Sequence, residues 1–218
     1  MSGRTDVLGH AWWLASRSAG VVAWLLLSLV VVLGLVMATR LAPVRGRAAL
    51  RRAHERVALL ALATVAAHGA LLLGDSFLRP GLSGVLLPFA SSYRPVWTGI
   101  GVLAAYLAAA LSLTYYARRR LGARRWRKAH RLIPVAWALA AVHVIGAGSD
   151  VGSRWLQVPL ALTLALVIAL LALRIAMSAG RRRVAVPQPP APARAPVREV
   201  STAPAPLWLH GDPERRHA

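Results

Sequence analysis

Four histidines lie within two apolar stretches of the chain and form two pairs of nearly equal spacing. Thirteen residues separate His54 from His68, and twelve separate His130 from His143. An ionisable side chain at membrane depth is costly, so it is a candidate for function. Neutral imidazole is a good ligand for haem iron, and an iron held between two histidines needs one from each of two facing helices. The spacing therefore predicts two stacked haems.

Helix geometry supports this reading for the first pair and sets a condition on the second. An α-helix rises about 1.5 Å and turns about 100° per residue. His54 and His68 then lie roughly 21 Å apart and within about 40° of one face. His130 and His143 lie roughly 20 Å apart, but about 140° apart around an ideal helix. We expect Pro134 to absorb this difference, because proline kinks a helix or occupies its first turn.

Depth decides which histidines face each other. His54 and His130 each adjoin an arginine-rich segment, whereas His68 and His143 lie about four turns further along, before polar loops. The predicted pairs are therefore His54 with His130 and His68 with His143. Two alternatives stay open: histidines that only pack in a bundle without redox function, and a site for another transition metal such as Zn, Cu or Ni.

Composition places the chain in a membrane. Of its 218 residues, 57% are hydrophobic and 16% are charged, whereas a soluble domain carries about a quarter charged residues. The apolar residues come in long blocks, which is typical of a polytopic membrane protein. We predict an all-α membrane helix bundle with about five transmembrane helices, over residues 19–38, 55–73, 97–116, 132–147 and 155–176.

The distribution of charge predicts the orientation. The net charge is +20, and most of the arginines fall within 40–56, 118–131 and 181–183. Positively charged loops stay in the cytoplasm, so the segments 39–54 and 117–131 are expected inside, with the N-terminus outside and the C-terminus cytoplasmic. This alternation along the chain argues against nucleic acid as a partner. The expected location is the cytoplasmic membrane, with the lipid bilayer around the bundle.

The predicted domains are an exported N-terminal segment over residues 1–18, a haem-binding transmembrane domain over 19–178, and a disordered cytoplasmic tail over 179–218. The tail is rich in Pro, Ala and Arg and has no helical period. Cysteine is absent, which excludes disulfides, thiolate ligation of haem and Cys-held iron–sulfur clusters from this chain.

Arginines near the histidines are candidates for binding haem propionates, because arginine pairs well with carboxylates. For the inner haem these are Arg52, Arg127 and Arg131; for the outer haem they are Arg17 and Arg94. The alternative is that the inner arginines serve only to orient the helices. Trp137 is expected to be an ordinary packing or lipid-facing residue, with packing between the haems as the alternative. Asp75 and Asp150 are expected to be solvated loop residues, with attraction of a cationic acceptor as the alternative.

The paired spacings H-x13-H and H-x12-H resemble the ferric reductase-like transmembrane family. This family includes the NADPH oxidases, the ferric reductases and the haem-binding membrane subunit of bacterial methionine sulfoxide reductase. The segments WWLASRSAGVVAWLLL at 12–27 and SSYRPVWTGIG at 91–101 are similar to actinobacterial members, and the resemblance covers roughly residues 12–178. It implies two b-type haems held by the four histidines, and electron flow between the cytoplasmic face and the outside.

The sequence departs from the larger oxidases of this family in two respects. Those proteins have one more N-terminal helix and a flavin and nicotinamide domain, whereas the residues after 178 contain no G-x-G-x-x-G turn. We therefore expect a separate cytoplasmic flavoprotein reductase or a membrane quinol as the electron donor. The expected external acceptor is ferric iron, oxygen or a periplasmic reductase. The alternative function is the haem-binding subunit of a periplasmic methionine sulfoxide reductase system.

Overall fold

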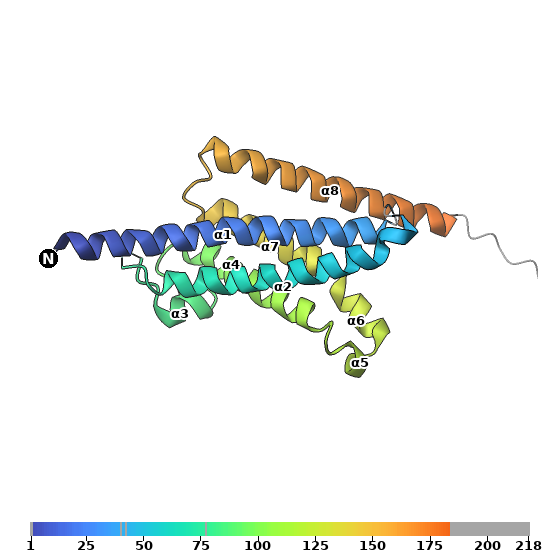
Figure 1. Ribbon diagram of the computed structural model, residues 1–218, viewed down its shortest axis with the longest axis horizontal. Coiled ribbons are helices and arrows are strands. Elements are labelled where there is room, and N and C mark those ends of the chain that lie inside the picture. The colour runs from blue at the N-terminus through green and yellow to red at the C-terminus, as the bar shows by residue number, and fades with distance from the viewer. Residues whose placement is uncertain (1, 40, 42, 77, 184–218) are drawn as a thin grey trace, which may run out of the picture. The chain divides into compact units, whose positions relative to one another are not determined.

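The computed structural model describes residues 2–39, 41, 43–76 and 78–183, and this part of the chain is helical with connecting turns (Figure 1). The predicted all-α class is confirmed. From residue 184 onward, the predicted tail lies outside the described residues. The elements are α1 (Ser2–Ala38), the 3-10 helix η1 (Val44–Gly46), α2 (Arg47–Leu72), α3 (Gly81–Leu86), α4 (Pro95–Leu113), α5 (Arg118–Leu121), α6 (Ala123–His130), α7 (Ile133–Ala147) and α8 (Arg154–Arg183).

Five stretches of the described helices are long and apolar enough to cross a bilayer, as predicted. Several begin earlier than expected; the first candidate span begins at Ala11 instead of about residue 19. Alanine and arginine are good helix formers, so the helices continue through polar segments that hydropathy alone assigns to loops. The spans are Ala11–Ala38, Val44–Leu72, Pro95–Leu113, Ala123–Ala147 and Arg154–Gly180.

Two antiparallel helix pairs organise the bundle. α1 packs along α2, and α4 packs along α7, while α1 also contacts α7 (Figure 1). A short connection favours this arrangement for α1 and α2, because consecutive helices joined by a few residues lie side by side in opposite directions. α4 and α7 are separated in the chain by the short helices α5 and α6. The connection between α1 and α2 includes η1. α2 and α7 therefore belong to different helix pairs. The ring of His68 on α2 faces the ring of His143 on α7.

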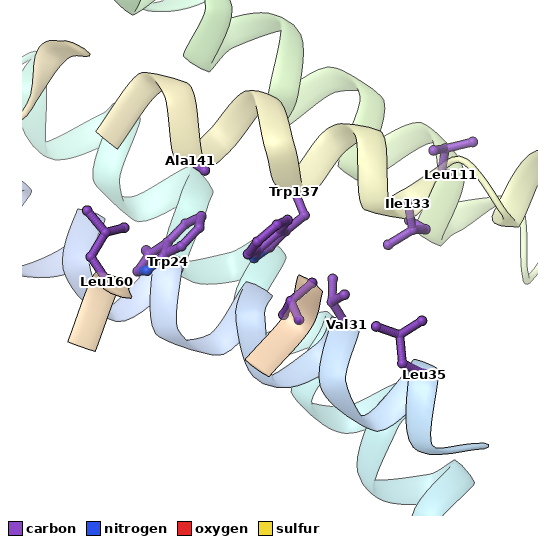
Figure 2. Packing of buried hydrophobic residues seen from close by; sticks show 9 residues of the cluster. Trp24, Val31, Leu35, Leu111, Ile133, Trp137, Ala141 and Leu160 are labelled. Atoms are coloured by element: carbon purple, nitrogen blue, oxygen red, sulfur yellow. The ribbon is translucent and has the colours of Figure 1, made fainter. Parts of the chain in front are cut away.

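A tryptophan pair forms the centre of the buried cluster between α1 and α7. The rings of Trp24 and Trp137 are stacked with centres 5.4 Å apart, and Trp137 Nε1 donates to Ser28 Oγ at 3.0 Å (Figure 2). Trp137 is thus a packing residue, 5% exposed. α8 contributes Leu160 and Val167 to the same cluster.

A break in the helix lies between the two histidines of the second pair. His130 is the last residue of α6, residues 131 and 132 form a turn, and α7 begins at Ile133 with Pro134 in its first turn. The predicted role of Pro134 is confirmed: its fixed φ and missing N–H suit the first turn of a helix. Because of this break, the positions of His130 and His143 need not follow one ideal helix, and each ring meets a histidine of α2.

The tryptophan pair predicts a stability difference. Trp137→Ala removes a buried ring and its hydrogen bond to Ser28, and should lower the free energy of unfolding by about 3 kcal/mol or more. Thermal unfolding in detergent, followed by circular dichroism, measures this change. Trp155→Ala is the control, since Trp155 is 55% exposed. Equal losses in the two variants would contradict the packing role.

Candidate functional site

The structure brings the four histidines together in the predicted pairs. Centres of the rings of His54 and His130 lie 6.3 Å apart with planes at 80°, and those of His68 and His143 lie 6.4 Å apart with planes at 68°. One member of each pair comes from α2 and the other from the end of α6 or from α7. Because α2 is a continuous helix, its two histidines share a face at two depths.

The spacing of the rings fits a metal ion between them. Two imidazoles on opposite sides of one metal, each with a bond of about 2.0 Å and a ring centre about 1.1 Å beyond the nitrogen, have centres roughly 6.2 Å apart. Within the described residues, no group of three or more His, Cys, Asp or Glu side chains could hold a metal. A tetrahedral zinc site would therefore lack ligands. An iron whose remaining ligands come from a porphyrin would need only two imidazoles from the protein, which is what each histidine pair offers.

We call His68 and His143 the outer pair, and His54 and His130 the inner pair, after the predicted orientation. Backbone carbonyls orient the outer pair. His68 Nδ1 lies 2.7 Å from the carbonyl oxygen of Ser16, and His143 Nδ1 lies 2.9 Å from that of Trp97. A carbonyl only accepts hydrogen bonds, so Nδ1 carries the proton in both rings and Nε2 keeps its lone pair. A hydrogen bond at one ring nitrogen is the usual way a protein orients a metal-binding histidine.

Ser16 holds His68 by a second contact. Its hydroxyl donates to the backbone carbonyl of His68 at 3.1 Å and lies 3.2 Å from His68 Nδ1. Ser16 is 1% exposed, although it lies near the end of an apolar helix. The buried serine therefore joins α1 to α2 at the level of the outer pair. Sequence reasoning missed Ser16 and Trp97; a backbone carbonyl leaves no signal in the sequence, because every residue supplies one.

The inner pair is held more loosely. His54 faces the carbonyl of Val30, and His130 faces that of Leu111. Neither contact reaches hydrogen-bond geometry, and both Nδ1 atoms are buried without a hydrogen-bond partner among the described residues. The ring of His130 instead stacks on Trp126, with centres 5.2 Å apart and planes at 29°.

The two outer arginines are engaged by the protein. Arg17 forms an ion pair with Asp150 in the loop after α7, and its guanidinium lies over the ring of Trp13. Arg94 Nη1 donates to the carbonyl of Gly146 at 2.7 Å. Both arginines thus join the end of the histidine helix α7 to its neighbours, which gives a structural reason for arginine on this side. Their contact with haem propionates stays a prediction.

The three inner arginines remain at the surface. Arg52, Arg127 and Arg131 are exposed at the end of the bundle where His54 and His130 lie. Their role toward propionates also stays a prediction. The prediction that both aspartates are solvated was wrong. Asp75 is 3% exposed and accepts a hydrogen bond from the Leu78 N–H at 3.2 Å, and Asp150 forms an ion pair with Arg17.

These observations define a class of protein: a multi-pass helical membrane protein with two facing histidine pairs at different depths. The family model described as "Ferric reductase like transmembrane component" matches residues 19–141, more than half of the chain, and the chain belongs to this family. Membership implies transmembrane electron transfer, and the family typically binds haem. No curated protein and no solved structure matches the chain.

Single histidine substitutions should separate the two sites. If each histidine pair holds one haem, as predicted, His68→Ala or His143→Ala should lose about half of the haem while the signal of the other pair persists. His54→Ala or His130→Ala should give the complementary loss. Haem per chain and the reduced-minus-oxidised visible spectrum measure the effect. Full haem content in all four variants would show that the histidines are not the ligands.

The ion pair between Arg17 and Asp150 predicts a measurable coupling. Both groups are partly buried, so Asp150→Ala should destabilise the outer end of α7 by leaving the Arg17 charge unpaired. A double-mutant cycle with Arg17→Met and Asp150→Ala should give a coupling of about 1 kcal/mol in thermal unfolding. Additive single losses would mean that the pair contributes nothing to stability.

Proposed function

We propose that this protein carries electrons across the cytoplasmic membrane on two b-type haems, from an internal donor to an external acceptor. One observation carries the proposal: facing histidine rings at two depths of the same helices, 6.3 and 6.4 Å apart between centres. Two haem sites at different depths would let electrons cross the bilayer in shorter steps, because a single site would leave most of the bilayer to be crossed in one step. The positions of the ligands on α2 lie roughly 21 Å apart along the helix.

The histidines would hold one iron between His54 and His130 and the other between His68 and His143. When bound, each haem supplies a one-electron iron couple. A histidine from each side would leave no open position on the iron, which would favour electron transfer over binding of a small molecule there. The protein's contribution is to bind, orient and bury the group, since a neutral ring with Nδ1 on a carbonyl offers Nε2 without a charge.

Arginine placement supports a direction through the membrane. The arginine-rich ends at η1 and at α5 and α6 are cytoplasmic in this proposal, with the N-terminus outside and the C-terminus inside. The inner pair then lies nearest the donor. The proposed propionate-binding arginines are Arg52, Arg127 and Arg131 on the inner side and Arg17 and Arg94 on the outer side.

Electrons would cross without a proton path. Among the five spans, Glu55 is the only acidic residue, and it accepts a hydrogen bond from the Tyr116 hydroxyl at 3.1 Å at the inner end. A proton relay uses a series of carboxylates or histidines through the membrane. With the four histidines assigned to iron, transfer would move net negative charge outward and respond to membrane potential.

The proposed donor is a cytoplasmic flavoprotein reductase or a membrane quinol, and the proposed acceptor is ferric iron, oxygen or a periplasmic reductase. The exposed arginines of α5 and α6 give the inner surface a positive charge, to which a negatively charged protein donor would be drawn. A quinol would instead reach the inner pair from the lipid. Dependence of the reduction rate on ionic strength separates the two donors.

A liposome experiment tests the proposal. The purified full chain should show b-type bands at about two haems per chain when reduced with dithionite. In liposomes with trapped ferricyanide, external dithionite should then bleach the ferricyanide only when the protein is present. Transfer should accelerate when an ionophore dissipates the opposing potential, because the process moves charge.

The matched control is His143→Ala, which keeps the inner pair and removes one outer ligand. It should retain haem yet fail to bleach the trapped ferricyanide. Absence of haem from wild-type protein expressed with ample haem supply would overturn the proposal. Equal bleaching with wild-type protein and with the His143→Ala variant would show that the electrons do not pass through the outer site.

A further inference from the structure

The carbonyls nearest the four histidine rings are regularly spaced, and those of Ser16 and Trp97 lie within hydrogen-bond distance. α1 supplies those of Ser16 and Val30, and α4 supplies those of Trp97 and Leu111. On each helix the two residues are fourteen apart, which returns the carbonyl to within about 40° of the same face after roughly 21 Å. The same spacing separates His54 from His68. α1 and α4 thus repeat the fourteen-residue spacing of the two histidines on α2.

A second regularity lies one turn further along. Four residues after the first three carbonyls stand Gly20, Gly34 and Gly101. A β-carbon on Gly20 would lie 3.0 Å from both Cε1 and Nδ1 of His68, and one on Gly34 would lie 3.3 Å from Cε1 of His54. The rings of His68 and His54 thus occupy the space that the β-carbon of any other residue at positions 20 and 34 would need.

Gly101 makes the closest approach of the three. A β-carbon there would lie 2.7 Å from Cε1 of His143 and nearer still to its Nδ1. Real β-carbons do not come so close, so His143 could not keep its position beside alanine. In an α-helix the residue four ahead already donates to the carbonyl, so the histidine uses the second lone pair of that oxygen.

The fourth carbonyl, that of Leu111, has no glycine four residues later, because α4 ends before that position. Four residues after Leu111 stands Tyr115, and α4 has ended at Leu113. There the ring of His130 stacks on Trp126, whose centre lies 5.9 Å from that of Tyr115. Beyond the end of α4, the ring of His130 therefore packs on the indole of Trp126 and not against a helix backbone.

We propose that Gly20, Gly34 and Gly101 are positioning residues that set the planes of the ligand imidazoles. We call each carbonyl with its glycine four residues later a ring seat: Ser16 with Gly20, Val30 with Gly34, and Trp97 with Gly101. The seat would fix the rotation of the ring that lies against it, and so contribute to the 80° and 68° angles between the ring planes of the two pairs. The inference rests on the proposed function, since it concerns the same four ligands.

Electron paramagnetic resonance of the ferric protein measures this rotation. The largest g value of a low-spin iron between two imidazoles rises as their planes approach a right angle. Gly20→Ala and Gly101→Ala should therefore shift the outer signal and its midpoint potential and leave the inner signal unchanged. Gly34→Ala should shift the inner signal alone. His143→Ala identifies the outer signal by removing it.

Gly99→Ala is the matched control. Gly99 lies on α4 two residues before Gly101, and a β-carbon there would lie 2.7 Å from Cε1 of Phe89. The steric conflict is comparable in size but its neighbour is not a ligand. Gly99→Ala should lower the thermal midpoint without moving either g value. Gly152→Ala, which meets nothing within 4 Å, should change neither property.

The outcomes are decisive in each case. Unchanged g values in folded, haem-containing Gly20→Ala and Gly101→Ala variants would overturn the inference, as would equal shifts in the Gly99→Ala variant. If Gly101→Ala does not fold, the milder contacts at Gly20 and Gly34 decide, and selective shifts of the outer and inner signal respectively are required. Wild-type protein without haem would instead overturn the proposed function itself.

Discussion

An imidazole nitrogen that is buried in a membrane without a partner is costly, because an unsatisfied polar group there costs several kcal/mol. The outer histidines meet this constraint on one side through the carbonyls of Ser16 and Trp97. On the other side each faces a second histidine at the distance that a shared metal requires. For the outer pair, the bundle presents a carbonyl to one edge of each ring and a partner ring to the other, whereas the inner rings have only the partner ring and, at His130, the face of Trp126.

The two antiparallel helix pairs follow from that requirement. α1 packs along α2, and α4 packs along α7, so each helix that carries predicted ligand histidines has its own supporting helix. The supporting helices must approach closely, and glycine permits this where a ring lies against the backbone. The tryptophan pair between α1 and α7 then joins the two halves through packing and one hydrogen bond. Support and ligation are thus divided between neighbouring helices.

Several features could be predicted from the sequence because they depend on local chemistry. Long apolar blocks predict the five spans, and the position of each histidine relative to arginine-rich segments predicts the two pairs, both of which the structure bears out. Pro134 marks the break between α6 and α7, since proline at a first turn is a local property. The start of the first span at Ala11 was missed, because helix propensity continues through residues whose hydropathy is low.

What the sequence by itself determined is the type of each side chain and its depth: four imidazoles, at two levels, on two apolar segments. Only the tertiary structure decided which backbone lies against each ring, because a carbonyl is common to all residues and a glycine has many uses. The pairing of Arg17 with Asp150 was also beyond sequence reasoning, since the two residues are far apart in the chain and meet only when α1 and α7 lie together. Depth is set by local hydropathy, whereas orientation is set by the packing of neighbouring helices.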